Sequence, residues 1–199
     1  MKSPKPALAG AALVLLLNLL ALTASLYGHY AERMLDRLPD ERALRASALA
    51  ATLAPWSAPH QALRGWIHGE SGDFATADRA YTIALSRAPA DALLWAEYAL
   101  VRCRNRVFDG RTTLATQRAL ALAPASPAVR QGVSRMALSY WRFGEPELRE
   151  LWRQSLRWEL DHNRATFLAT LDREGYRATF CAWHAAGLGE EPWCGGTAP

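Results

Sequence analysis

Three cysteines are the residues of this chain whose chemistry depends most clearly on spacing. Cys181 and Cys194 flank a segment that contains glycine and proline, and such a segment can bend to the geometry that a disulfide requires. Closing that loop would stabilise the C-terminal segment by about 3 kcal/mol on the chain-entropy model. Cys103 lies between apolar and charged neighbours on a predicted helix, where a thiol packs as a small apolar group. We expect a Cys181–Cys194 disulfide and a buried Cys103, with three free, inert thiols as the alternative.

The other residue types that commonly form reactive or metal sites do not have the necessary spacing. His60 and His68 are eight residues apart, and no His/Cys spacing matches a zinc or haem motif. Asp161-His162 lies near Ser155, but no nucleophile-elbow sequence surrounds that serine. No glycine-rich phosphate loop is present. The sequence therefore predicts no catalytic residues, no bound metal and no cofactor.

Tryptophan and arginine are concentrated together near the C-terminus. Five of the eight tryptophans lie in the last third of the chain, among several arginines. Aromatic and guanidinium groups in one groove could bind a sugar ring or an acidic glycan, in which case Trp152, Arg153 and Trp158 would carry the binding. The alternative is that these tryptophans fill the core between helices, and the helical spacing of large apolar side chains favours this interpretation.

Composition and charge indicate the class of protein. The chain has 199 residues, of which 50% are hydrophobic, with alanine and leucine far commoner than valine and isoleucine. No strand-like alternation stands out, so we predict an all-α fold. The net charge is +4, but the arginines are scattered among comparable numbers of Asp and Glu. Without a basic block of the kind that follows a phosphate backbone, we expect no nucleic-acid binding.

An uncharged, mostly apolar run covers residues 7–26 and is long enough, at about 30 Å, to span a bilayer. We predict a transmembrane helix over 7–27, since no clear cleavage site follows it. A cleaved signal peptide and a buried helix of a water-soluble domain are the alternatives. Lys2 and Lys5 precede the run, which predicts a cytoplasmic N-terminus and a periplasmic remainder in a bacterial inner membrane.

A helical repeat organises the rest of the chain. An Ala-x-x-x-x-Pro ending occurs at residues 50–55, 84–89 and 119–124, so it returns every 34 or 35 residues. The small residue allows a neighbouring helix to approach closely, and the proline ends the helix. The spacing of apolar residues predicts helices over 40–54, 59–70, 73–87, 92–104, 111–122, 127–142, 146–160, 165–173 and 177–186.

These elements predict five segments: a cytoplasmic N-terminus (1–6), the anchor (7–27), a juxtamembrane linker (28–39), a helical repeat array (40–160), and capping helices with a C-terminal tail (161–199). Solenoids need a terminal element that covers their last apolar face.

The segment 72–89 resembles the tetratricopeptide repeat. The resemblance lies in Gly72, Asp73, Phe74, Ala77, Tyr81, Ala84 and Pro89, with Gly65 in the preceding helix. It implies a short tetratricopeptide-like solenoid of helical hairpins in which the first helices line a concave surface that binds partners. By resemblance, Trp66, Arg104 and Arg135 belong to that surface.

The whole layout is similar to that of small VpsP-type polysaccharide biosynthesis proteins. The similarity lies in the short anchor and in the segments Leu53-Ala-Pro-Trp56, Tyr140-Trp141 and Phe180-Cys-Ala182. It implies a non-catalytic membrane adaptor that supports exopolysaccharide synthesis or export through protein contacts. An assembly factor for a secretion, pilus or cytochrome system is one alternative, and a module that binds polysaccharide directly is the other.

Overall fold

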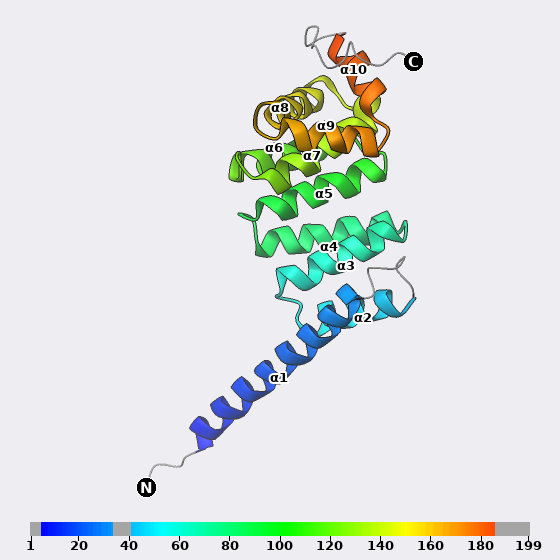
Figure 1. Ribbon diagram of the computed structural model, residues 1–199. Coiled ribbons are helices and arrows are strands. Elements are labelled where there is room, and N and C mark those ends of the chain that lie inside the picture. The colour runs from blue at the N-terminus through cyan, green and yellow to red at the C-terminus, as the bar shows by residue number, and fades with distance from the viewer. Residues whose placement is uncertain (1–4, 34–40, 186–199) are drawn as a thin grey trace.

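The computed structural model describes residues 5–33 and 41–185, and the side chains of 13–29 and 41–181. The elements of this part of the chain are helices, with no strand among them, so the all-α prediction is confirmed (Figure 1). In order they are α1 (Lys5–Arg33), α2 (Glu41–Leu53), α3 (Ala58–Glu70), α4 (Phe74–Arg87), α5 (Ala92–Arg104), α6 (Gly110–Leu122), α7 (Pro127–Tyr140), the 3-10 helix η2 (Trp141–Phe143), α8 (Pro146–His162), α9 (Arg164–Arg173) and α10 (Arg177–Ala185).

The helices begin where the sequence places capping residues. The side chains of Asp73, Asp91 and Asp109 each accept a hydrogen bond from a backbone N–H in the first turn of the helix that follows. These bonds satisfy donors that the first turn of a helix leaves without a partner. Helices α3, α7 and α8 have a proline in the first turn, where its missing N–H costs nothing.

The three predicted repeat endings have the same geometry. Ala50, Ala84 and Ala119 are fully buried. In each case their carbonyl accepts a hydrogen bond from the N–H four residues later, at 2.9 to 3.2 Å. The indole N–H of Trp95 donates to the carbonyl of Pro89 at 2.9 Å, and the guanidinium of Arg130 donates to that of Pro124 at 2.8 Å. The second pair repeats the first pair 35 residues later in the sequence, so the period seen in the sequence is also a period of the structure.

The turns inside three hairpins are also alike. A residue with positive φ stands at each of them, namely Gly72 (83°), Arg106 (58°) and Gly175 (73°). The next N–H then donates to the carbonyl five residues earlier, at 2.8 or 2.9 Å. Glycine adopts this left-handed conformation without strain, whereas Arg106 does so at a cost.

Two glycines, Gly65 in α3 and Gly144 just before α8, make room for large buried rings. A Cβ atom at Gly65 of α3 would lie 2.7 Å from Cδ2 of Tyr81 in α4, and one at Gly144 would lie 2.6 Å from the Trp152 ring. Tyr81 and Trp152 are both fully buried. In both cases the missing side chain leaves room for a fully buried ring.

The hairpins stack into an elongated array with α1 extending away from one end and α10 at the other (Figure 1). Phe167, Leu171 and Phe180 of α9 and α10 are buried, and the two phenylalanine rings meet edge to face at 5.5 Å. These contacts lie where the sequence predicts a cap.

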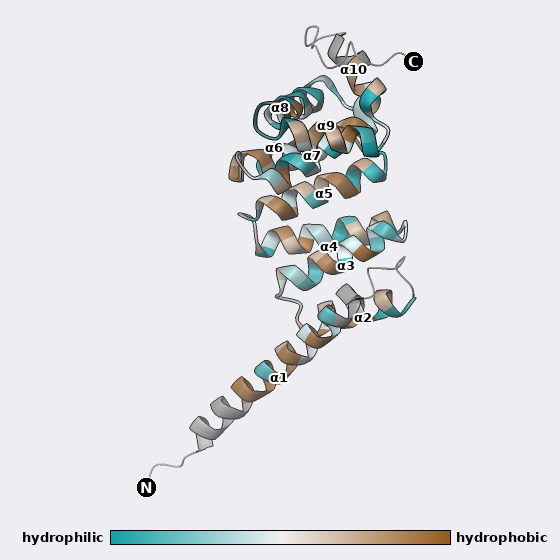
Figure 2. Cartoon of the chain, viewed as in Figure 1, coloured by the Kyte–Doolittle hydropathy of each residue, from teal (hydrophilic) through white to brown (hydrophobic). Residues whose placement is uncertain are grey.

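Helix α1 continues to Arg33, so part of the segment predicted as a linker (28–39) is helical; residues 34–40 lie outside the described part. Its last turns pack against α2 and α3, with Ala24 and Gly28 buried. Farther toward the N-terminus its leucines are exposed. Figure 2 colours most of this stretch of α1 brown, as hydrophobic. Among the described residues, no helix combines the length and the hydropathy needed to cross a membrane. The anchor over 7–27 stays a prediction.

We predict that Gly65→Ala lowers the free energy of unfolding by about 1–3 kcal/mol, since the new methyl group overpacks against the Tyr81 ring. Gly132→Ala is the matched control, because a Cβ there meets nothing within 4 Å. As a helix-interior glycine, it should gain about 0.5–1 kcal/mol on substitution. Urea denaturation followed by circular dichroism measures both. Equal effects of the two substitutions would contradict the packing argument.

Candidate functional site

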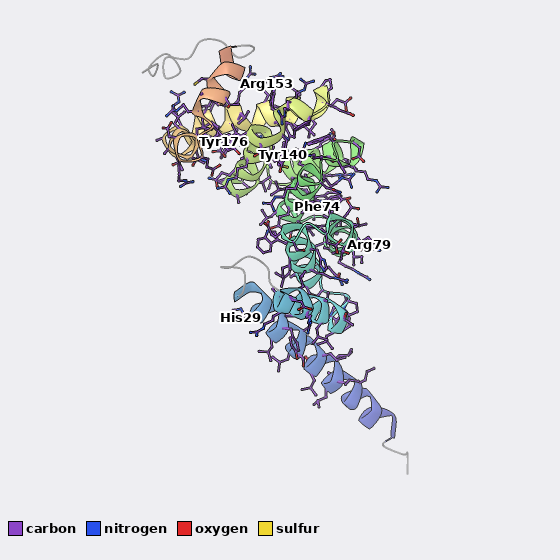
Figure 3. The ribbon with its side chains drawn as sticks, turned by 90° about the vertical axis from the view of Figure 1, so that its right-hand side faces the viewer. His29, Phe74, Arg79, Tyr140, Arg153 and Tyr176 are labelled. Atoms are coloured by element: carbon purple, nitrogen blue, oxygen red, sulfur yellow. The ribbon has the colours of Figure 1, made fainter. Side chains whose placement is uncertain are left out.

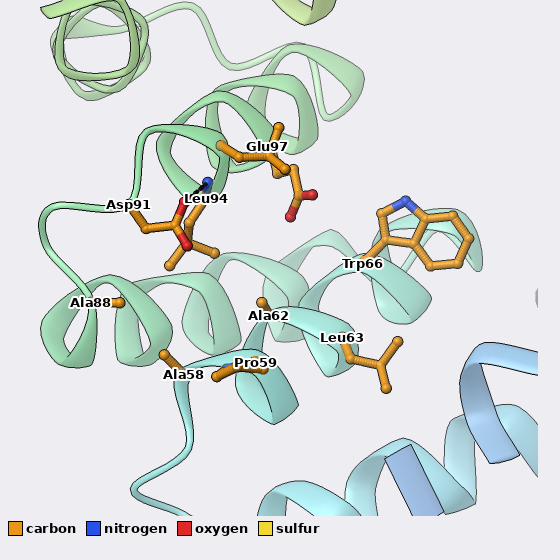
Figure 4. Close-up of a pocket in the computed structure, with 10 residues that line it drawn as sticks. Ala58, Pro59, Ala62, Leu63, Trp66, Ala88, Asp91, Leu94 and Glu97 are labelled. Carbon is orange, nitrogen blue, oxygen red and sulfur yellow. Dashed lines mark hydrogen bonds between the residues drawn. The ribbon is translucent and has the colours of Figure 1, made fainter. Parts of the chain in front are cut away.

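A groove of about 480 Å³ lies between α3 and α5, and we call it the α3–α5 groove (Figure 4). Its walls are mostly apolar, and two carboxylates stand on the α5 side. The lining residues are Ala58, Pro59, Ala62, Leu63, Trp66, Ala88, Asp91, Leu93, Leu94 and Glu97.

Helical spacing places these residues on facing surfaces. Leu63 and Trp66 of α3 are three apart, and Asp91, Leu94 and Glu97 follow each other at intervals of three from the N-cap of α5. The carboxylate of Asp91 accepts a hydrogen bond from the N–H of Leu94 at 3.1 Å, which fixes the start of the helix. The groove is thus bordered by the first helices of two consecutive hairpins.

Glu97 is the distinctive polar residue of this groove. Its carboxylate points into the space between the two helices (Figure 4), and the hydroxyl of Tyr81 donates to it at 3.4 Å. Burial raises the pKa of Glu97; the bond from Tyr81 opposes this shift, and the charge of Asp91 adds to it. In the described part of the chain Glu97 forms no salt bridge. A cationic group entering the groove would therefore find a carboxylate that lacks a charged partner.

The residues predicted by resemblance are distributed over several sites. Trp66 lines the groove and is half-buried, as a contact residue should be. Arg104 forms a salt bridge with Glu70, which joins α5 to α3. Arg135 of α7 is exposed, donates to Glu174 at 3.4 Å and lines a different cavity. Only Trp66 among the three lies at the α3–α5 groove.

The described tryptophans of the C-terminal third, Trp141, Trp152 and Trp158, contact other side chains of the protein. Trp152 is fully buried and packs against Trp141 at 6.4 Å between ring centroids, so it presents no surface to a glycan. The Trp158 ring stacks on His162 at 4.5 Å between ring centroids, and the guanidinium of Arg130 lies over the Trp158 ring, 5.8 Å from its centroid. Arg153 forms a salt bridge with Glu150. These contacts agree with the core interpretation for Trp152.

Cys103 is buried with a free thiol, and burial raises its pKa to about 12. Such a thiol is inert near neutral pH. Cys194 lies outside the described residues, so the predicted Cys181–Cys194 disulfide stays a prediction. Within the described ranges no cluster of three or more His, Cys, Asp or Glu residues could hold a metal ion.

The sequence interpretation did not single out Asp91 or Glu97. A signal was present, because Glu97 is the one charged residue in the otherwise apolar stretch 92–101 of α5. Charged residues are seldom buried in a protein core without a partner, so a charge inside an apolar helix segment indicates a position with a role other than packing.

No protein-family model matches this chain, and no curated protein matches its sequence. The function is therefore argued from the geometry of the groove.

We predict that Glu97→Gln changes how stability depends on pH. The raised pKa of Glu97 means that the folded chain holds this proton more tightly than the unfolded chain, where the carboxyl titrates near its ordinary value of 4.5. The wild type therefore loses stability as the pH rises from 4.5 through the folded-state pKa, and the variant does not lose that contribution. Urea denaturation at intervals between about pH 4 and 8 measures the difference between the two proteins.

Tyr81→Phe serves as the internal control for this measurement. It removes the hydrogen bond that opposes the raised pKa of Glu97, so the loss of stability should move to higher pH. Parallel pH profiles for the wild type and Glu97→Gln would show that Glu97 titrates normally in the folded chain.

Proposed function

We propose that this protein is a non-catalytic adaptor that holds a partner protein in the α3–α5 groove, as one component of a bacterial membrane assembly. The observation that carries the proposal is the groove itself: it is open, mostly apolar and bordered by two hairpins, with a half-buried carboxylate that lacks a charged partner. Apolar clefts with a few fixed polar groups are the usual form of recognition sites.

The chemistry of the lining defines the partner. Leu63, Trp66 and Leu94 offer apolar contact, and the indole of Trp66 gives the kind of aromatic anchor that contributes strongly to binding. Asp91 and Glu97 add negative charge on the opposite wall. We propose that the groove takes up a segment of a partner protein that combines apolar side chains with a lysine or arginine.

The assembly in this proposal is one that synthesises or exports an exopolysaccharide. Support comes from the resemblance to tetratricopeptide repeats and to VpsP-type proteins, together with the periodic hairpins. The proposal includes an anchor over residues 7–27 in the inner membrane, a cytoplasmic N-terminus and a periplasmic helical array. Its support is the apolar sequence of that run and the exposure of the leucines and valine from 13 to 19, at 44–66%.

We predict that a photo-crosslinking amino acid at Trp66 captures the partner in cells, whereas the same group at Arg79 does not. Arg79 is exposed on α4 and is not part of the groove (Figure 3). Adding Glu97→Lys to the Trp66 probe should reduce capture at least tenfold, because it replaces attraction of a cation by repulsion. Mass spectrometry then identifies the captured protein.

Capture that is equal at positions 66 and 79, or unchanged by Glu97→Lys, would refute the groove as the contact site. A captured component of a secretion, pilus or cytochrome system would keep the adaptor and reject its assignment to polysaccharide export.

We predict that the full-length protein stays in the membrane fraction after alkaline carbonate extraction. Replacing both Leu16 and Leu19 by arginine should release it, because each charge at the centre of a spanning helix costs about 2.5–3.5 kcal/mol. Release of the wild type by carbonate would refute the anchor and leave the groove proposal untouched.

A further inference from the structure

A second cavity, of about 200 Å³, lies between α7 and α9 and has a different lining from the α3–α5 groove. It is bordered by Ser134, Arg135, Glu159, Thr166, Phe167 and Arg173, together with neighbouring residues. We propose that this cavity binds a small hydroxylated carboxylate of the size of one sugar acid, with hydroxyl groups on Glu159 and Ser134 and the carboxylate on Arg135 and Arg173. The proposal goes beyond the adaptor function and does not depend on any partner protein.

The floor of the cavity contains two buried polar atoms without a hydrogen-bond partner. Glu159 of α8 is 1% exposed, and Ser134 of α7 is 2% exposed. Glu159 Oε2 accepts a bond from Asn163 Nδ2 at 3.3 Å, whereas Glu159 Oε1 and Ser134 Oγ have none. Buried polar atoms in native proteins are nearly always paired, so this pair calls for a ligand group that donates hydrogen bonds.

The rim of the cavity carries positive charge. Arg135 and Arg173 share one acidic partner, Glu174, at 3.4 and 3.8 Å, and Arg130 acts on Glu159, so three guanidinium groups stand against two carboxylates. The side chains of Arg135 and Arg173 are 61% and 70% exposed, so both can turn toward a ligand. These cations disfavour an ammonium ligand and favour a carboxylate, which guanidinium groups bind well.

Size and shape limit the ligand further. Pockets for drug-sized molecules usually measure about 300–1,000 Å³, so a cavity of about 200 Å³ suits a single ring. Phe167 of α9 supplies an apolar wall against which the C–H face of a sugar ring can pack. A ligand that donates from hydroxyls at one end and carries a carboxylate at the other meets the floor and the rim together.

The test titrates glucuronate into the full-length protein in detergent and follows the backbone amides by NMR. We expect saturable shifts at Ser134 and Phe167, with a dissociation constant on the order of 1 mM, as for other ligands of this size. Glucose lacks the carboxylate and cyclohexanecarboxylate lacks the hydroxyls, so each should bind at least tenfold more weakly. A trimer of uronate units distinguishes the source: tighter binding than the monomer indicates a polymer, and weaker binding indicates a free sugar acid.

Two variants separate binding from folding. Ser134→Ala removes a buried hydroxyl that has no partner in the free protein, so it should leave the urea midpoint unchanged or higher while weakening glucuronate about tenfold. Arg135→Gln should weaken glucuronate by a similar factor, and Arg79→Gln on α4 should not.

Three results would overturn the proposal: no saturation by glucuronate, equal binding of glucose, or affinity unchanged by Ser134→Ala and Arg135→Gln. A marked loss of stability in Ser134→Ala without any glucuronate binding would show that the cavity holds a bound water only. None of these results bears on the α3–α5 groove, which the crosslinking experiment tests separately.

Discussion

The close approach of paired helices at small residues is the constraint on which this structure depends. The ring of Tyr81 lies against the bare backbone of Gly65, and the ring of Trp152 lies against Gly144. Interiors pack at nearly crystalline density, so a methyl group at Gly65 would push α3 and α4 apart, and one at Gly144 would displace the Trp152 ring. The buried alanines near the ends of α2, α4 and α6 are likewise small residues at closely packed positions.

The polar groups of the interior fall into two kinds. Arg102 is buried, and its guanidinium donates to Asp78 of α4 at 2.5 Å and to Asp109 at the start of α6 at 2.7 Å. These two interactions link α5 to α4 and to the start of α6, which suits a structural role. Glu97 and Glu159 differ, because burial raises the pKa of both. Glu97 forms no salt bridge within the described chain, and Glu159 Oε1 has no hydrogen-bond partner there. These carboxylates distinguish the two candidate sites from the network that stabilises the stack.

Most of the fold could be predicted from sequence because its signals are local. Capping aspartates, N-terminal prolines and the 34- or 35-residue period determine the limits of α2 to α10 to within about two residues, whereas α1 extends six residues beyond the predicted anchor. The sites could be predicted only in part, since they depend on distances between helices. Whether Arg104 is free or paired with Glu70 depends on residues 34 apart. Trp152 and Trp158 lie about 120° apart on one helix, so spacing alone cannot say which faces the core. Glu159 follows Leu148, Trp152 and Ser155 on the buried stripe of α8, a signal that the sequence interpretation overlooked.

Helix α1 contains the proposed anchor, and its C-terminal turns contact α2 and α3 of the array. Ala24 is fully buried, and a Cβ at Gly28 would lie 3.0 Å from the ring of His60 in α3, so the last turns of α1 pack as part of the stack. The helix that precedes them carries the exposed leucines. A continuous helix transmits orientation, whereas a flexible linker would not. On the proposed attachment to a membrane, α1 therefore sets the angle and height of the array above the bilayer. The α3–α5 groove, bordered by the first two hairpins after α2, then lies on the part of the array nearer the membrane, where a partner that is itself embedded in the bilayer can reach it.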